Sequence, residues 1–239
     1  MNLAIDHGNS RIKIGVFDQS SLLESQIFNN KEEFGQWTNG KTFKDLIVSS
    51  VSQPLDSLIA MVAVEGKKLK LTQSLSLPIE IEYDTRETLG VDRIAAACGA
   101  IDKLPDRNCL VIDLGTCINY EFITADARYL GGAISPGVKM RFDAMHTFTA
   151  RLPLVKPNED VGLVGKSTEE CMQSGVMNGV LAEIDGVISR YKVKYPNLAP
   201  ILCGGDAFLF ENKVKQPIFV APNLVLMGLN RILLHNVDY

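Results

Sequence analysis

The chain has 239 residues, of which 46% are hydrophobic and 22% are charged, proportions typical of a globular protein with a buried core. Its formal net charge of −4 and its lack of a concentrated basic patch argue against a nucleic-acid surface. The five cysteines lack CxxC spacing and the three histidines are scattered, which argues against a zinc site or a disulfide framework and favours reduced thiols in the cytosol.

The N-terminal segment predicts a strand, a tight turn and a second strand. Residues 3–5 are apolar and run directly into Asp6, with Gly8 two positions later. Residues 11–17 then alternate polar and apolar side chains, the pattern of a strand with one buried face. This start lacks the basic region of a secretory signal, and no apolar run approaches the ~20 residues that span a membrane, so we expect a cytoplasmic protein without a membrane partner.

The rest of the first half alternates short strands with helices, which indicates a mixed α/β fold. Pro54 suits the first turn of one of these helices, where its missing N–H sacrifices no hydrogen bond. The expected elements are strands at 22–28 and 45–50, a short helix within 29–44 and a helix after Pro54.

Asp92 and Arg93 stand side by side ahead of a helix that the apolar pattern predicts over residues 94–104. In a structural interpretation, Asp92 caps the helix and favours its positive end, which contributes about 0.5–2 kcal/mol. In a functional interpretation, Asp92 accepts a proton from a substrate hydroxyl while Arg93 orients an anionic or polar substrate group. These residues alone favour the cap.

The strand, Asp and Gly of the N-terminus recur at residues 110–116. The second copy follows a polar break, and its Asp113 lies 107 positions after Asp6 in a chain of 239 residues. We therefore expect one chain folded as two similar halves, residues 1–105 and 106–239.

The repeated turn has the chemistry of a phosphate site. A Gly after a strand lets the backbone turn tightly and bring N–H groups close to phosphate oxygens, and Asn9, Ser10 and Thr116 add short neutral donors. An Asp beside a polyphosphate would repel it, so Asp6 and Asp113 are expected to hold a cation, directly or through water. Either copy alone is also an ordinary turn, but the pairing favours the functional interpretation.

The second half also has glycine-rich and helical segments. Residues 129–137 contain three glycines and a proline, which predicts close approach of the backbone to a ligand or another strand, with a helix opening at Pro136. Ser167 starts a capping box ahead of a long amphipathic helix, and Thr168 could reach a ligand from its N-terminus. Residues 200–207 predict a strand, a Gly-Gly pair and a helix start, a shape suited to lie against a nucleoside.

The ordered motifs are Asp6-x-Gly-Asn-Ser10, Gly90-Val-Asp-Arg93, Asp113-x-Gly-Thr116, Gly131-Gly-x-Ile-x-Pro-Gly137 and Gly204-Gly205. Over essentially its whole length, the chain thereby resembles type III pantothenate kinases, members of the superfamily that includes acetate kinase, sugar kinases, Hsp70 and actin. The resemblance implies an α/β fold of two duplicated actin-like, ribonuclease H-like domains with a nucleotide cleft between them. The N-terminal half would carry the first phosphate loop and the substrate motif. The C-terminal half would carry the second phosphate loop, the Gly-Gly turn on the nucleoside side and the long helices.

The resemblance implies ATP-dependent phosphorylation of pantothenate to 4′-phosphopantothenate, the first step of coenzyme A biosynthesis. It also implies Mg²⁺ with the ATP, a monovalent cation (potassium or ammonium), and a homodimer with its pantothenate pocket at the subunit interface. Two alternatives stay open: a kinase for another small alcohol or acid, and a non-catalytic regulator that binds nucleotide or pantothenate. The Gly-x-Asp-Arg motif argues against the first, and joint retention of Asp6, Asp92, Asp113 and Thr116 argues against the second.

The resemblance further assigns roles to single residues. Asp92 matches the family's catalytic base and Asp113 its monovalent-cation ligand, while Asp6 is expected to hold Mg²⁺, directly or through water. The sequence departs from the family pattern in two motifs, since Arg11 brings a charge into the first loop and residues 117–121 replace small and hydroxyl residues. The expected ATP contacts are Asp6, His7, Gly8, Asn9, Ser10, Arg11, Ile12, Lys13 and Thr116. The expected pantothenate contacts are Tyr83, Gly90, Val91, Asp92, Arg93 and Thr168.

Overall fold

The contacts within the computed structural model divide the chain into two compact units. Each unit has its own sheet and its own buried core. The described residues are 1–8, 11–50 and 55–237. Unit 1 consists of Met1–Asp106, Ile123–Gly131 and the residues from Asn223 onward, and unit 2 of Arg107–Phe122 and Gly132–Pro222.

The sheet of unit 1 has the strand order β3-β2-β1-β5-β7. The first three strands pair antiparallel in chain order, as the N-terminal pattern predicts, whereas β5 runs parallel to β1 and β7 parallel to β5. Leu3 and Ile5 of β1 lie in a buried core with Phe34, so the alternate side chains of β1 point to the opposite face. The strands are β1 (Asn2–His7), β2 (Ile12–Asp18), β3 (Ser21–Phe28), β5 (Leu46–Ser50) and β7 (Lys68–Lys70).

The sheet of unit 2 repeats this arrangement with the order β11-β10-β9-β12-β13. Three consecutive strands lie side by side, and β12 runs parallel to both β9 and β13. This repeat confirms the expected fold of two duplicated α/β domains, while the nucleotide cleft stays a prediction. The first residues of β11 belong to unit 1 and pair there with β8 (Glu80–Ile81). The strands are β9 (Cys109–Leu114), β10 (Cys117–Ile123), β11 (Arg128–Pro136), β12 (Ala199–Cys203) and β13 (Phe219–Val220).

The helices bury one face against the sheets. The helix of residues Thr168–Lys194, α5, begins with the predicted capping box, in which the Ser167 hydroxyl accepts a hydrogen bond from the N–H of Glu170 at 3.2 Å. Its predicted apolar face lies in the core of unit 2. No helix within the described ranges has both the length and the apolar character that crossing a bilayer requires. The other helices are α1 (Lys31–Thr38), α2 (Asp56–Ala60), α3 (Val91–Lys103), α4 (Val138–Phe148) and α6 (Leu224–Asn236).

Short elements complete the units. In unit 1, β4 (Thr42–Phe43) pairs with β6 (Ala63–Val64), and a 3-10 turn, η1, covers Arg86–Thr88. In unit 2, a second 3-10 turn, η2, covers Ala207–Leu209.

Some predicted boundaries differ from the structure. The helix expected to open at Pro136 begins two residues later at Val138, because β11 continues as part of the sheet through the proline. The helix predicted over residues 94–104 begins earlier, at Val91. The last helix, α6, belongs to unit 1 although it lies in the C-terminal half of the sequence.

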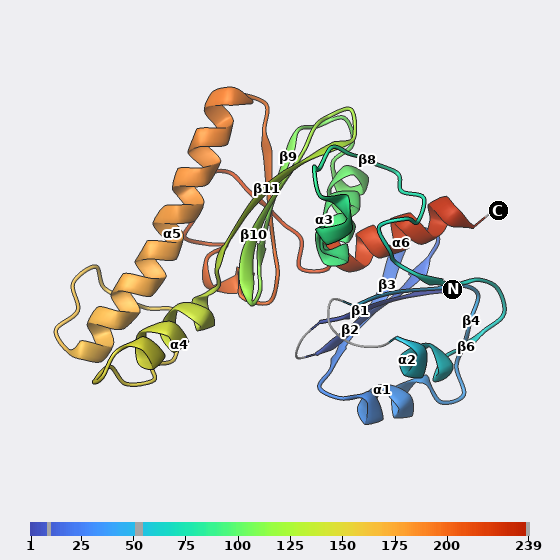
Figure 1. The fold of residues 1–239 in the computed structure, drawn as a ribbon, viewed down its shortest axis with the longest axis horizontal. Coiled ribbons are helices and arrows are strands. Elements are labelled where there is room, and N and C mark those ends of the chain that lie inside the picture. The colour runs from blue at the N-terminus through green and yellow to red at the C-terminus, as the bar shows by residue number, and fades with distance from the viewer. Residues whose placement is uncertain (9–10, 51–54, 238–239) are drawn as a thin grey trace. The chain divides into compact units, whose positions relative to one another are not determined.

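Helices α3 and α6 pack side by side at very close range in unit 1 (Figure 1). A Cβ added to Gly228 of α6 would clash with the carbonyl of Ala95 and lie 2.7 Å from the nitrogen of Gly99. A Cβ added to Gly99 would in turn clash with the carbonyl of Leu224. The two backbones approach this closely only because both residues lack a side chain. Since α3 carries Asp92 at its start, this packing positions a predicted site residue.

Replacing Gly228 with alanine is expected to lower the free energy of unfolding by about 1–3 kcal/mol, because the added methyl group has no space between the helices. Urea unfolding followed by circular dichroism measures the change. The control is Gly186→Ala on α5, where nothing lies within 4 Å of the added methyl group. That variant should gain about 0.5–1 kcal/mol from better helix propensity. Equal effects of the two substitutions would contradict the tight helix crossing.

Candidate active site

The first Asp-x-Gly turn joins β1 to β2 in unit 1. The N–H of Gly8 donates to the carbonyl of Arg11 at 3.1 Å and closes the turn. The Asp6 carboxylate accepts a hydrogen bond from Ser49 Oγ on β5 at 3.0 Å. Lys13 pairs with Asp6 across the antiparallel strands, so their side chains share one face of the sheet. The predicted ATP contacts that lie outside the described residues are Asn9 and Ser10.

The charge of Asp6 is only partly compensated in unit 1. Burial is the largest influence and raises the pKa of Asp6 above its usual value. The hydrogen bond from Ser49 and the charge of Lys13 lower this pKa, and the charge of Asp92 raises it again. Asp6 and Asp92, which come from separate sequence motifs, therefore lie close enough for their charges to interact. Two neighbouring carboxylates in a half-buried position favour a bound cation.

His7 and Ile12 pair across β1 and β2 and point to the face of the sheet opposite Asp6. Both side chains are buried, so on the Asp6 face only their backbone could contact ATP. Burial, helped by the charge of Lys31, lowers the pKa of His7, which is therefore neutral at neutral pH. Arg11 is exposed beside the turn.

The second Asp-x-Gly turn joins β9 to β10 in unit 2, and the N–H of Gly115 closes it by donating to the carbonyl of Cys117 at 3.0 Å. The junction between β11 and α4 packs on this turn. Gly137 donates its N–H to the carbonyl of Thr116 at 3.2 Å, and a Cβ on Gly137 would clash with that carbonyl. The positive end of α4 therefore lies beside the exposed Thr116, an arrangement suited to binding phosphate.

The Gly-Gly turn after β12 packs against Asp113. Gly204 has a φ of +92°, and a Cβ there would clash with Asp113 Oδ1 and the carbonyl of Leu114, so the position requires glycine. The N–H of Asp206 donates to the carbonyl of Leu114 at 2.9 Å, and burial raises the pKa of Asp206. Asp206 is not among the predicted site residues, although it follows a strand and two glycines. That position is the signal that could have identified it.

Helix α3 carries the predicted base in its first turn. Gly90 is the N-cap residue and makes no side-chain cap, and Asp92 Oδ1 accepts a hydrogen bond from the N–H of Arg93 at 2.9 Å. Asp92 therefore does not form the usual N-cap, in which a residue before the helix bonds an N–H two or three positions on. A Cβ on Gly90 would lie 2.5 Å from Asp92 Oδ1, so glycine leaves space for the carboxylate. Val91 is buried.

Tyr83 and Arg93, both predicted pantothenate contacts, lie together in unit 1. Arg93 is only 8% exposed, and its guanidinium carbon lies 5.8 Å from the centroid of the Tyr83 ring. The Tyr83 ring also lies 6.1 Å from the ring of Tyr129 and packs against Gly131, whose φ is +94°. The remaining predicted contact, Thr168, is the exposed first residue of α5 in unit 2.

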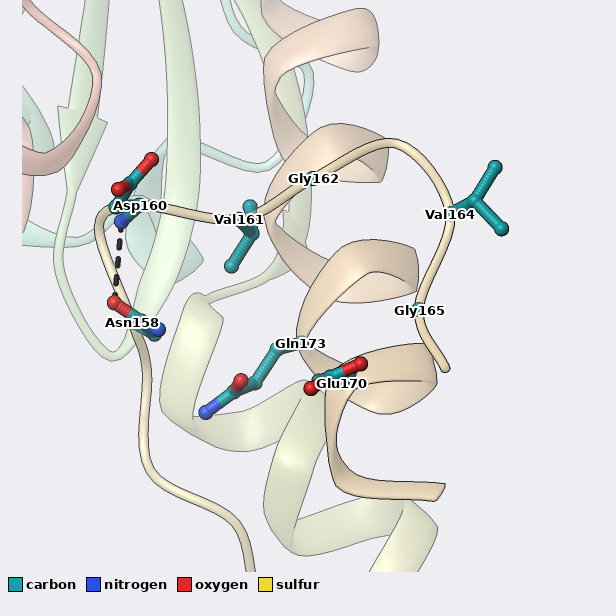
Figure 2. A pocket seen from close by; sticks show the side chains of 8 residues that line it. All are labelled: Asn158, Asp160, Val161, Gly162, Val164, Gly165, Glu170 and Gln173. Carbon is teal, nitrogen blue, oxygen red and sulfur yellow. Dashed lines mark hydrogen bonds between the residues drawn. The ribbon is translucent and has the colours of Figure 1, made fainter. Parts of the chain in front are cut away.

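Unit 2 also contains a cavity of about 230 Å³ between residues 158–165 and the first turns of α5 (Figure 2). Asp160 and Glu170 line it, and no basic side chain does. Asn158 Oδ1 accepts a hydrogen bond from the N–H of Asp160 at 3.1 Å. Because this lining disfavours anions, the cavity suits neither a phosphate nor a carboxylate ligand.

The described residues contain no group of three or more His, Cys, Asp or Glu side chains that could hold a metal ion by themselves. Mg²⁺ in phosphoryl transfer needs no such group, because phosphates and water supply most of its ligands beside one or two carboxylates. Asp6, with its partly compensated charge, fits such a role. Asp113, near the carbonyl of Leu114 and the turn of Gly204, offers oxygen ligands of the kind that a hard cation prefers.

Solved structures share this fold over nearly the whole chain. A conserved Baf family protein of Campylobacter jejuni superposes with a TM-score of 0.66 at 21% identity, covering 98% of each chain. The ethanolamine utilization protein EutJ of Carboxydothermus hydrogenoformans superposes with a TM-score of 0.56 at 12% identity, covering 96% of this chain and 89% of that one. The chain thus falls into the class of duplicated α/β proteins that share this fold.

The family follows from sequence. The model of the family described as type III pantothenate kinase matches residues 2–190. The type III pantothenate kinase of Cytophaga hutchinsonii is 44% identical over 237 residues, covering 99% of this chain and 100% of the relative. That of Christiangramia forsetii is 43% identical over 240 residues, covering 99% of each. The chain belongs to the type III pantothenate kinase family.

Replacing Asp6 with asparagine is expected to raise the melting temperature at neutral pH, because a half-buried carboxylate charge near Asp92 is removed. The folded-state pKa of Asp6 lies above its usual value of 3.8, so wild type loses stability as the pH rises from that value through the folded pKa. Thermal melts at several pH values measure the difference, which should vanish in acid. A variant that melts lower than wild type at neutral pH would show that the charge is fully compensated.

Proposed function

We propose that this chain transfers the γ-phosphoryl group of ATP to the primary hydroxyl of pantothenate, with Asp92 as the general base. Membership of the family supports the reaction. The observation that supports the assignment of the base is the interaction of the Asp92 charge with Asp6 within unit 1. The product, 4′-phosphopantothenate, is the first intermediate on the way to coenzyme A.

Asp92 would orient the substrate hydroxyl and take its proton as the phosphoryl group transfers. Phosphoryl transfer has a loose transition state with charge spread over the oxygens, so the protein contributes chiefly positioning and charge stabilisation. The N–H of Arg93 holds one carboxylate oxygen of Asp92, which leaves the other to meet the hydroxyl. The guanidinium carbon of Arg93 lies 5.8 Å from the centroid of the Tyr83 ring, and Arg93 would supply a positive charge for the pantothenate carboxylate.

The two Asp-x-Gly turns would supply phosphate contacts. Lys13 lies on the Asp6 face of the first turn, and the Thr116 hydroxyl and the positive end of α4 belong to the second. Mg²⁺, when bound, neutralises phosphate charge and orients the transferring group. Asp6 would hold it, directly or through water, and Asp113 would hold the potassium or ammonium ion.

A homodimer in the cytoplasm belongs to the same proposal. Unit 2 exposes large apolar side chains near the end of α4 and in the segment before α5, with Phe148 85% exposed, Leu163 83% and Val164 78%. Exposed apolar side chains that form one contiguous patch are typical of surfaces that a partner covers. We infer that a second copy of the chain covers this surface, and that the pantothenate pocket lies at the interface.

Replacing Asp92 with asparagine should lower kcat about 10²–10⁴-fold, because the variant keeps the shape of the site but cannot accept the proton. ADP release from ATP and pantothenate measures turnover, and calorimetry measures binding of both substrates, which should persist. Asp102→Asn near the other end of α3 is the matched control and should retain wild-type turnover. A wild-type protein that binds both substrates without turnover would contradict the kinase and favour a regulator.

Replacing Asp113 with asparagine should raise the potassium concentration needed for half-maximal activity at least about tenfold, because a cation ligand loses its charge. Initial rates in potassium, with sodium as the matched salt, measure this shift. The dependence on Mg²⁺ should stay as in wild type. An unchanged potassium response would assign the cation to another site.

A further inference from the structure

Glu183, in the middle of α5, accepts hydrogen bonds from three different elements of unit 2. Tyr120 of β10 donates its hydroxyl at 2.9 Å, and Ser135 of β11 donates its hydroxyl at 2.6 Å. Arg141 of α4 donates from Nη2 at 2.5 Å and forms an ion pair. The Glu183 and Arg141 side chains are each about one quarter exposed, so the pair is well shielded from solvent.

This cluster continues to the second Asp-x-Gly turn. Arg141 also donates from Nε to the carbonyl of Pro136 at 2.9 Å, so its guanidinium joins Glu183 to the last residue of β11. The next residue, Gly137, donates its N–H to the carbonyl of Thr116 and packs directly on the turn. An unbroken series of contacts therefore runs from α5 to the turn of Thr116.

The protonation states of Glu183 and Tyr120 allow the hydrogen bonds that connect α5 to the turn of Thr116. Burial acts to raise the pKa of Glu183, but its three hydrogen bonds outweigh burial and leave the pKa below the usual value. Burial, and then the hydrogen bond and charge of Glu183, raise the pKa of Tyr120. At neutral pH the carboxylate is therefore ionised and the phenol is a neutral donor, as these hydrogen bonds require.

The three elements that carry the donors to Glu183 each start or end at the Thr116 turn or at the junction packed on it. β10 starts directly after the turn, β11 ends at the junction that packs on it, and α4 begins at that junction. Another ion pair on α4, between Lys139 and Asp143, does not link α4 to another element. It joins side chains one helical turn apart, and these are 79% and 41% exposed.

We propose that Glu183 is a positioning residue for the nucleotide. Through Arg141 and Ser135 it holds the β11–α4 junction against the Thr116 turn, so that the turn and the positive end of α4 are set to receive phosphate oxygens. The proposal rests on the proposed function for its substrate, ATP. Its geometry lies wholly within unit 2.

Glu183→Gln keeps the size of the side chain and removes its charge. It should raise KM for ATP and weaken ADP binding about tenfold or more, because displacing a positioning group by about 1 Å has effects of that order or larger. KM for pantothenate should stay within about twofold of wild type, a split that general loss of structure would not produce. Tyr120→Phe removes one of the three hydrogen bonds and should shift the same two quantities in the same direction, by less.

The experiment measures initial rates at varied ATP and varied pantothenate, ADP binding by calorimetry, and melting temperature, all on the full chain. Asp143→Asn is the matched control on α4 and should bind ADP and ATP as wild type does. Wild-type ADP affinity in Glu183→Gln would overturn the proposal, as would equal rises in both KM values or an equal effect of Asp143→Asn.

Should Glu183→Gln fail to fold, Tyr120→Phe decides by the same criteria. The proposed function fails separately, if wild type releases no ADP in response to pantothenate. In that case ADP binding by the variants still tests the anchoring of the turn.

Discussion

Each unit places a carboxylate at the end of its central strand, and the rest of the architecture accommodates that constraint. A strand buried on both faces is a stable place for aliphatic side chains but a costly one for a charge. In unit 1, Asp6 accepts a hydrogen bond from the Ser49 hydroxyl and feels the charge of Lys13, and a second carboxylate, Asp92, adds to the cost. Two neighbouring carboxylates of this kind cost stability unless a bound cation offsets their charges.

Glycine residues let one backbone segment approach another closely at the candidate site. Gly137 and Gly204 bring two separate segments onto the second turn, and Gly228 lets α6 lie directly on α3. The polar groups of the candidate site are therefore positioned by main chain rather than by long side chains. Main chain in packed strands and helices has little freedom, which suits a reaction that depends on placement.

Patterns among residues that are neighbours in the sequence predict much of the fold. The alternating residues of β2 and the Asp-Gly pairs at Asp6 and Asp113 depend on neighbours in sequence, so the strands, the turns and the duplicated fold could be derived without coordinates. The partner of α6 could not, because an apolar helix face does not specify which helix it will meet. Glu183 could not be distinguished from an ordinary helix carboxylate until the donors of three other elements converged on it. The neighbouring residues alone could not separate a helix-capping from a catalytic Asp92, because both roles use the same residue type and Asp92 lies in the first turn of α3.

The discontinuity of unit 1 has a consequence for how the protein is made. Its last helix, α6, is synthesised only after the whole of unit 2, and until then the glycine-bearing face of α3 and one face of the first sheet lack their cover. The first unit can therefore complete its core only once the last segment of the sequence has been made. Nascent unit 1 therefore presents apolar surface until α6 is made, and such surface favours aggregation of a partly folded chain.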